Sequence, residues 1–288
     1  MKLFRHGAKG QEKPGILDAQ GRRRDLSGIV VDIDAQLLAS GFAALKDVSA
    51  ATLPEVPAVT RFAEPVGGVG KFVCIGLNYR DHAAEAKMKI PAEPIIFMKA
   101  TSAIIGPNDP VVMPPLSQKS DWEVELGIII GQEARYVPLE RALDFVAGVC
   151  VCNDLSERHF QTERGGQWDK GKGCDTFGPF GPYLVTLDEA GDLDSLHLWL
   201  DVNGTRMQDG STRDMIFNVP FLVHYVSQFM SLQPGDIIST GTPAGVGMGR
   251  NPPVFLQEGD EIHLGIDGLG EQLQQVRRYA AAPAQGAG

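Results

Sequence analysis

Cysteine is scarce in this sequence, and long hydrophobic runs are missing from it. Four cysteines among 288 residues are too few and too unevenly spaced for a disulfide framework, so we expect them to be reduced and packed. The longest apolar runs fall well short of the ~20 residues that a membrane helix needs. The first residues also lack the apolar region of a signal peptide. We therefore expect a cytoplasmic protein with no membrane partner.

Basic residues are in the minority as well. Lys and Arg number 26 against 36 Asp and Glu, which gives a formal net charge of −10. A chain with this charge repels nucleic-acid phosphates and anionic membrane surfaces, so we expect no nucleic-acid partner. The one basic run, Arg22–Arg24, lies beside a turn and is interpreted as a solvated hairpin edge.

Glycine and proline, in contrast, are plentiful. The chain has 34 Gly and 19 Pro, and 43% of its residues are hydrophobic. This composition favours many turns and short elements around a sizeable core, and it disfavours a helical bundle or coiled coil. Because the expected strands outnumber the helices and do not alternate with them, we predict a β-rich mixed α/β fold and no doubly wound parallel sheet.

The chain divides into two expected parts. Strand, turn and helical patterns in residues 1–65 predict a small N-terminal α+β domain, which ends in Pro- and Gly-rich sequence. Residues 66–288 form the second, larger domain, whose tail at 280–288 is expected to be frayed. Expected strands lie at 2–6, 15–18, 22–26, 72–76, 95–98, 111–113, 124–130, 145–152, 183–187, 196–202, 236–240 and 260–266, and expected helices at 35–45, 81–88 and 217–229.

Two glutamates at the start of an apolar strand form the first candidate site. Glu123 and Glu125 are two residues apart, so on a strand both side chains point to one face. Asp154 ends the next apolar run along the chain. Three carboxylates with no nearby His or Cys cluster suit a hard divalent cation, Mg²⁺, Mn²⁺ or Ca²⁺. The alternative is a solvent-facing pair of glutamates, because the E-x-E pattern alone is common.

His82 and Glu85 form the second candidate site. Their separation of three residues places them on one face of a helical turn. A carboxylate beside an imidazole fixes the tautomer of the ring and raises its basicity, as a general base requires. The alternative is an ordinary polar pair on a surface helix.

A glycine-rich loop and two lysines complete the candidates. The loop at 240–247 follows a predicted strand and offers backbone N–H groups and hydroxyls to an anion. It matches neither the Walker nor the dinucleotide-binding pattern. Lys99 and Lys172 lie next to or within apolar sequence, where a lysine can hold a substrate carboxylate. The alternatives are a plain tight turn and solvated lysines.

Taken together, these stretches resemble the fumarylacetoacetate hydrolase superfamily from about residue 71 to residue 276. The resemblance depends on their order and number, since each stretch alone is a weak signal. The matching stretches are Gly76-Leu77-Asn78-Tyr79-x-x-His82-x-x-Glu85, Phe97-Met98-Lys99, Asp121-x-Glu123-x-Glu125-Leu126, Asn153-Asp154, Lys172-x-x-Asp175-Thr176-Phe177-Gly178-Pro179, Gln208-x-Gly210-x-Thr212-x-x-Met215 and Thr240-Gly241-Thr242-Pro243.

The resemblance implies a β-sandwich roll with the active site at its mouth, usually in a homodimer. It implies one divalent ion per subunit, Mg²⁺ or else Mn²⁺ or Ca²⁺, held by Glu123, Glu125 and Asp154. His82 and Glu85 would activate water, and the segment 79–94 would act as a lid. Lys172 is the third expected catalytic residue, and the expected substrate contacts are Gly76, Tyr79, Arg80, Lys99, Gln208, Thr240 and Thr242.

The implied activity is hydrolysis of the C3–C4 bond of a 2,4-diketo acid to pyruvate and a carboxylic or hydroxy acid. The substrate is an acylpyruvate or a 2,4-diketo-3-deoxy sugar acid such as diketo-deoxyrhamnonate, and the sequence leaves its distal part open. Polar candidates to bind a sugar-like tail are Arg80, Gln167, Gln208 and Asn218.

Other activities fit the same resemblance. One is an oxaloacetate-type decarboxylase, and another is an isomerase or hydratase of an unsaturated 2-keto acid in aromatic catabolism. A ureidoglycolate lyase ranks low, because no residue demands that substrate. A catalytically silent binding protein on the same scaffold is disfavoured, because the chain keeps the three carboxylates and the His82–Glu85 pair.

Overall fold

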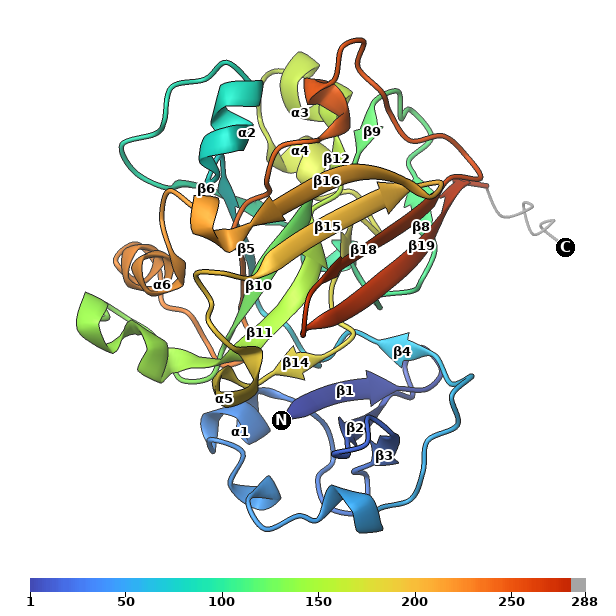
Figure 1. The fold of residues 1–288 in the computed structure, drawn as a ribbon, viewed down its shortest axis with the longest axis vertical. Coiled ribbons are helices and arrows are strands. Elements are labelled where there is room, and N and C mark those ends of the chain that lie inside the picture. The colour runs from blue at the N-terminus through green and yellow to red at the C-terminus, as the bar shows by residue number, and fades with distance from the viewer. Residues whose placement is uncertain (281–288) are drawn as a thin grey trace, which may run out of the picture.

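β-strands dominate the structure, a computed structural model that describes residues 1–280. Over that range the strands build a ten-stranded sheet and a five-stranded sheet, with two short strand pairs beside them (Figure 1). The expected β-rich mixed α/β class is therefore confirmed. The tail expected to be frayed lies, apart from its first residue, outside the described residues.

The ten-stranded sheet holds the most deeply buried strands. β10 (Val124–Ile130) pairs antiparallel with β11 (Val146–Asn153), and every residue of β10 is buried. Continuous apolar runs of this kind are typical of strands that are covered on both faces. The order of the sheet is β3 (Arg23–Asp25), β2 (Lys13–Leu17), β1 (Lys2–His6), β14 (Leu184–Val185), β11, β10, β17 (Ile237–Ser239), β5 (Phe72–Gly76) and β6 (Ile95–Lys99), with β4 (Phe62–Ala63) paired to β1.

The five-stranded sheet packs against β10. Its strand β15 alternates buried and half-buried residues, as a strand with one face on the core does. Leu198 and Leu200 of β15 join Leu126 and Ile128 of β10 in one buried cluster. The order of this sheet is β16 (Thr205–Ser211), β15 (His197–Val202), β18 (Glu261–Ile266), β19 (Gly270–Arg278) and β8 (Val111–Met113), and the short pairs are β9 (Ser120–Asp121) with β12 (Ser156–Glu157) and β7 (Ile104–Ile105) with β13 (Gly178–Pro179).

The N-terminal residues extend the ten-stranded sheet. β1 pairs antiparallel with β14, so the sheet crosses residue 65, where we placed a domain boundary. The helix expected at 35–45 is wrong in its extent, because α1 spans only Ala35–Ala39. Gly41 and Phe42 both have left-handed backbone conformations, and the chain resumes as a 3₁₀ helix at Ala43–Leu45.

Short helices surround the sheets. α2 spans Arg80–Glu85 and α6 spans Val219–Ser227, so both are shorter than expected. The Asn218 side chain caps the first turn of α6. Within residues 1–280 we find no helix with the length and apolarity to cross a bilayer. The other helices are α3 (Arg158–Glu163), α4 (Asp169–Lys172) and α5 (Leu187–Ala190), with 3₁₀ helices at Ala50–Thr52, Thr101–Ala103, Leu139–Phe145, Thr212–Asp214 and Gly247–Gly249.

The basic run at 22–24 is only in part the solvated edge that we expected, since Arg22 is exposed and β3 ends the ten-stranded sheet. Arg24 is buried, and its Nε donates to the Asp18 carboxylate at 2.9 Å. Asp18 also accepts the backbone N–H groups of Gln20 and Arg22 at 2.9 and 3.0 Å. Burial raises the pKa of Asp18, but these hydrogen bonds outweigh it and lower the pKa to about 2. Asp18 therefore needs its charge to hold the turn together.

We expect Asp18→Asn to lower the melting temperature at pH 7 by a few degrees. A carboxyl whose folded pKa lies below its unfolded value of ~3.9 stabilises the fold above pH ~4, and this contribution is lost as pH falls toward the folded pKa. The difference between wild type and variant in thermal unfolding should therefore shrink between pH 7 and pH 3. A difference that stays constant over this range contradicts the assignment.

Candidate active site

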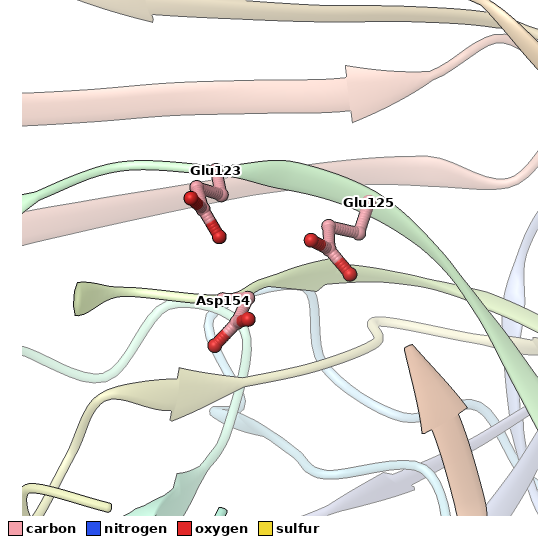
Figure 2. A group of neighbouring side chains, drawn as sticks. All are labelled: Glu123, Glu125 and Asp154. Atoms are coloured by element: carbon pink, nitrogen blue, oxygen red, sulfur yellow. The ribbon is translucent and has the colours of Figure 1, made fainter. Parts of the chain in front are cut away.

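Three carboxylates converge where β10 meets the end of β11. Glu123, Glu125 and Asp154 are buried, and one oxygen of each lies within 4.8 Å of the other two. Figure 2 shows the three carboxylates turned toward one another, with both glutamates above Asp154. The glutamates are therefore not the solvent-facing pair of the alternative interpretation.

The strand register explains how Asp154 reaches the glutamates. Val124 pairs with Asn153, so the next residue, Asp154, continues beside Glu123. The Asp154 N–H donates to the Glu123 carbonyl at 2.9 Å, and the Asn153 side chain accepts the Glu123 N–H at 3.1 Å. Glu125 lies two residues farther on and shares the face of Glu123, as the period of a strand requires.

Cationic side chains pair with two of the three carboxylates. Lys172 Nζ lies 2.6 Å from Glu123 and 2.7 Å from Asp154. Lys99 Nζ lies 2.5 Å from Asp154, and the Arg158 guanidinium lies 2.6 Å from Glu123. Burial alone raises the pKa of Glu123, but Lys172 and Arg158 outweigh it and hold that pKa far below its usual range. Burial lowers the pKa of Lys172, but Asp154 and Glu123 outweigh it and raise that pKa, so Lys172 stays protonated.

Glu125 has no cationic side chain bonded to it in the part of the chain that the structure describes. Its Oε2 accepts the Ser239 hydroxyl at 2.6 Å and the Gly241 N–H at 2.9 Å. Burial, together with the charges of Asp154 and Glu123, raises the pKa of Glu125 well above its usual range. A divalent cation fits this site, because it would offset the repulsion among the three carboxylates. Three carboxylate oxygens are also the donors that Mg²⁺, Mn²⁺ and Ca²⁺ prefer.

The His82–Glu85 pair forms on α2 as the spacing predicts. His82 Nδ1 lies 3.1 Å from Glu85 Oε2, and Glu85 Oε1 accepts the Gly245 N–H at 3.0 Å. Gly245 has a φ of +107°, and a Cβ there would lie 2.0 Å from the Met207 carbonyl, so this position requires glycine. A carboxylate accepts the proton of Nδ1, which leaves Nε2 of His82 as the basic nitrogen.

In the segment expected to be a lid, 79–94, α2 contacts the glycine-rich loop, whereas residues 87–90 are exposed. α2 lies at the upper edge of the molecule, beside the loop that precedes β18 (Figure 1). The Asp81 carboxylate accepts the Ala244 N–H at 3.1 Å, next to the bond between Glu85 and Gly245. Both contacts attach α2 to the glycine-rich loop.

One cavity joins these groups. It measures about 300 Å³, at the low end of the ~300–1,000 Å³ that ligand sites occupy. Asp154 is fully buried behind the two glutamates. The charged and polar side chains that line the cavity include His82, Glu123, Glu125, Arg158, Lys172 and Thr242.

Two of the seven expected substrate contacts, Gly76 and Thr242, line this cavity. Arg80 lines a separate hollow, and its guanidinium donates to the Met215 carbonyl at 2.6 Å. Lys99 is buried behind Asp154, to which it donates. These positions differ from the direct contacts that we expected of Arg80 and Lys99.

The remaining three expected contacts lie behind the cavity wall. Gln208 accepts the Val124 N–H at 2.9 Å and donates to the Thr242 hydroxyl at 2.8 Å. It therefore joins β10 to the glycine-rich loop. Within the described residues, 1–280, the hydroxyls of Tyr79 and Thr240 are buried without a hydrogen-bond partner.

Sequence reasoning missed Arg158. It follows the Asp154 stretch, where no pattern marks an arginine as buried. Its Nε donates to Asp121 at 2.9 Å, and its other donors reach Glu123 and Gln161 at 2.6 and 3.1 Å. Arg158 thus fixes one of the expected metal ligands from a helix that the sequence did not reveal.

Arg158→Ala is expected to destabilise the fold by about 3–5 kcal/mol, because it leaves Asp121 and Glu123 buried with one cation fewer. Urea unfolding measures this difference. Arg141→Ala is the matched control, because the Arg141–Asp144 pair at 3.0 Å is exposed and is expected to contribute less than about 1 kcal/mol. Equal effects of the two substitutions contradict the prediction.

Sequence relatives match the chain over most of its length. The family model described as fumarylacetoacetate (FAA) hydrolase C-terminal matches residues 71–277. A Burkholderia cenocepacia protein named "Putative hydrolase" is 59% identical over 279 residues, which are 96% of this chain and 99% of that protein.

Solved structures are similar over nearly the whole chain. A fumarylacetoacetate hydrolase from Exiguobacterium antarcticum is 38% identical with a TM-score of 0.87, over 97% of this chain and 100% of its own. The maleylpyruvate hydrolase of Sphingobium sp. SYK-6, solved with manganese(II) and pyruvate, is 30% identical with a TM-score of 0.81, over 97% and 100%. A 5-carboxymethyl-2-hydroxymuconate delta-isomerase from Mycobacterium smegmatis is 31% identical with a TM-score of 0.77, over 98% and 100%. The chain therefore belongs to the fumarylacetoacetate hydrolase family.

Proposed function

We propose that this protein hydrolyses the C3–C4 bond of a 2,4-diketo acid and releases pyruvate. The observation that carries the proposal is the shared cavity, which His82, hydrogen-bonded to Glu85, lines together with Glu123, Glu125 and Lys172. A base and a binding site for a 2-oxo acid are the two parts that such a hydrolysis needs. The manganese and pyruvate in the maleylpyruvate hydrolase support the assignment by similarity.

The residues would act in sequence. Nε2 of His82 takes a proton from water, and the resulting hydroxide adds to the C4 carbonyl carbon. The C3–C4 bond then breaks, and its electron pair leaves on the pyruvyl fragment as an enolate. Protonation at C3 gives pyruvate, and the C4 fragment leaves as a carboxylic acid. Lys172, protonated between Glu123 and Asp154, adds positive charge near the enolate.

A divalent cation held by Glu123, Glu125 and Asp154 would supply Lewis-acid stabilisation at the 2-oxo acid end of the substrate. We propose one ion per chain, with Mg²⁺ ahead of Mn²⁺ and Ca²⁺. We also propose a homodimer, which analytical ultracentrifugation tests.

Decarboxylation of an oxaloacetate-type acid is the second candidate. It uses the same carboxylates and Lys172 to stabilise the same enolate. Decarboxylation does not require an activated water molecule. Isomerisation of an unsaturated 2-keto acid does not require one either. The hydrogen bonds that orient Glu85 and His82 therefore favour hydrolysis.

Isotope-labelled water separates these activities. Metal-depleted protein is supplied with Mg²⁺ and assayed for pyruvate release from acetylpyruvate and from oxaloacetate in H₂¹⁸O. Hydrolysis predicts ¹⁸O in the acetate released from acetylpyruvate. Release of carbon dioxide from oxaloacetate, with no release of pyruvate from acetylpyruvate, supports the decarboxylase instead.

A further inference from the structure

Much of the cavity wall plays no part in the proposed chemistry. Apart from Glu123, Glu125, Arg158, Lys172 and His82 and the polar side chains of Gln161, Thr162 and Thr242, the wall is apolar. The large apolar side chains are Ile75, Leu77, Met88, Phe97, Trp168 and Met248. They come from β5, the lid segment, β6, the start of α4 and the glycine-rich loop region, so the apolar wall is assembled from distant parts of the chain.

Two aromatic rings form the fixed part of this wall. Phe97 and Trp168 pack edge to face, with ring centroids 5.4 Å apart. The Trp168 ring is seated against the backbone of Gly76, where a Cβ would lie 2.6 Å from a ring carbon. The Lys172 Nζ lies 5.0 Å from the centre of the Phe97 ring. The apolar wall therefore begins directly beside the charged end of the cavity.

Two methionines line the cavity with much of their surface exposed. Met88 is 53% exposed and Met248 is 42% exposed. Exposed apolar side chains at the wall of a ligand site gain free energy when a hydrocarbon group covers them. Methionine is flexible and polarizable, so it adapts to hydrocarbon groups of different shape.

The polar side chains that we considered for a sugar-like tail lie elsewhere. Arg80 and Asn218 line the separate hollow beside α6, and Gln167 lines a neighbouring hollow that shares Phe97 and Trp168 with the cavity. Gln208 is 1% exposed and bonds to Thr242. None of these four residues lines the cavity that holds His82 and the glutamates.

Besides Arg158, two polar side chains of α3 line the cavity, and each has one hydrogen-bonding function in use. The side-chain oxygen of Gln161, Oε1, accepts from Arg158, and the Thr162 hydroxyl donates to the Arg158 carbonyl. A chain of hydroxyl groups placed against the wall would give up its hydrogen bonds to water and find few replacements. This loss disfavours a hydroxylated tail.

We infer that the substrate is an acylpyruvate whose C4 group is a hydrocarbon chain or ring, held between the Phe97–Trp168 wall and the methionines Met88 and Met248. The inference rests on the proposed function and decides between the two substrate classes that the sequence left open. The 2,4-diketo-3-deoxy sugar acids are the class that it excludes.

Steady-state kinetics on a substrate series tests this inference. Acetylpyruvate, butanoylpyruvate, hexanoylpyruvate and one 2,4-diketo-3-deoxy sugar acid are compared with the Mg²⁺-loaded protein. Burial of one methylene predicts a rise of about fourfold in kcat/KM per added CH₂ until the cavity is full. The sugar acid is expected to fall at least ~100-fold below hexanoylpyruvate. A kcat/KM that stays constant or falls as the acyl chain lengthens overturns the inference, and so does a higher kcat/KM for the sugar acid than for hexanoylpyruvate.

A binding measurement separates this inference from the proposed function. Calorimetry with Mn²⁺ and straight-chain 2-oxo acids, from 2-oxobutanoate to 2-oxooctanoate, needs no turnover. Affinity that rises with chain length supports the apolar subsite even where no diketo acid is hydrolysed, in which case only the proposed function fails. Affinity that does not depend on chain length, or no binding of any of these acids, overturns the inference.

A methionine double variant and a control variant test whether Met88 and Met248 contact the acyl chain. Met88→Ser with Met248→Ser is expected to reduce the ratio of kcat/KM for hexanoylpyruvate over acetylpyruvate by about tenfold. Leu143→Ser removes a comparably exposed apolar side chain (41% exposed) that does not line the cavity, and it should leave this ratio unchanged. An unchanged ratio in the methionine variant, or an equal fall in the Leu143 control, contradicts the proposed position of the acyl group.

Discussion

Glu125→Gln is expected to abolish the response of the protein to Mg²⁺ or Mn²⁺ while leaving the metal-free fold at least as stable as wild type. The glutamine carbonyl oxygen can still accept from Ser239 and Gly241. The amide group takes the place of the other oxygen, and it carries no charge to bind a cation. The substitution therefore separates metal binding from folding.

The pKa of Glu125 determines the sign of the stability change. A carboxyl whose folded pKa is raised destabilises the folded state at any pH above its unfolded pKa, and most strongly above the folded pKa. Removing its charge relieves that penalty, so metal-free Glu125→Gln should melt at or above the wild-type temperature at pH 8. Turnover should fall at least ~100-fold, because the cation is needed to stabilise the enolate.

Thermal unfolding with and without excess Mn²⁺ measures both effects. A ligand at about 100 times its Kd adds about 2.7 kcal/mol to wild-type stability, and the variant should gain nothing. Glu133→Gln is the matched control, because Glu133 is exposed and does not line the cavity. A Glu125 variant that keeps the metal-induced shift refutes the cation site.

The second prediction with a large expected effect concerns the His82–Glu85 pair, the proposed general base. His82→Ala and Glu85→Gln are each expected to lower kcat for acylpyruvate hydrolysis by about 10²–10⁴-fold while Mn²⁺ still raises the melting temperature. In Glu85→Gln, the carbonyl oxygen is needed to accept the Gly245 N–H, so the amide NH₂ is left to donate to His82 Nδ1. Nε2 would then carry the proton and could not take one from water.

The two variants should be about equally slow, because a base and the group that orients it act as a unit. Lys89→Ala is the control on the same segment, since Lys89 is exposed and does not line the cavity. Hydrolysis that survives in His82→Ala removes this residue from the mechanism. Loss of hydrolysis with retained oxaloacetate decarboxylation in the same variant confirms that the pair serves the water step alone.

Local spacing made part of the site predictable. Glu123 and Glu125 share a strand face because strand side chains alternate with period two, and His82 meets Glu85 because a helical turn brings residues three apart together. Asp154 was predictable as the acid that ends the partner strand. Each of these predictions needs only the geometry of one or two neighbouring elements.

Other features did not follow from these regular spacings. The helix expected at 35–45 ended early because Gly41 and Phe42 turn left-handed, and Arg24 was buried by a turn that the charge pattern alone does not reveal. Gln208 belongs to a matching motif and Arg80 was an expected substrate contact, yet neither lines the cavity. A motif identifies residues, but it does not say which way each side chain faces.

The amino-acid sequence alone indicated the family, through the order and number of its matching stretches. It also indicated the strand-rich class, the Glu123–Glu125 pair and the His82–Glu85 pair, because these follow from residue types at short, regular spacings, and it indicated Asp154 as the acid that ends the next apolar run. The tertiary structure alone decided that Lys99, Lys172 and Arg158 neutralise two of the carboxylates and not Glu125. It also decided that the cavity continues as an apolar wall. Both depend on long-range packing, since charge balance and the lining of a cavity arise only where distant segments meet.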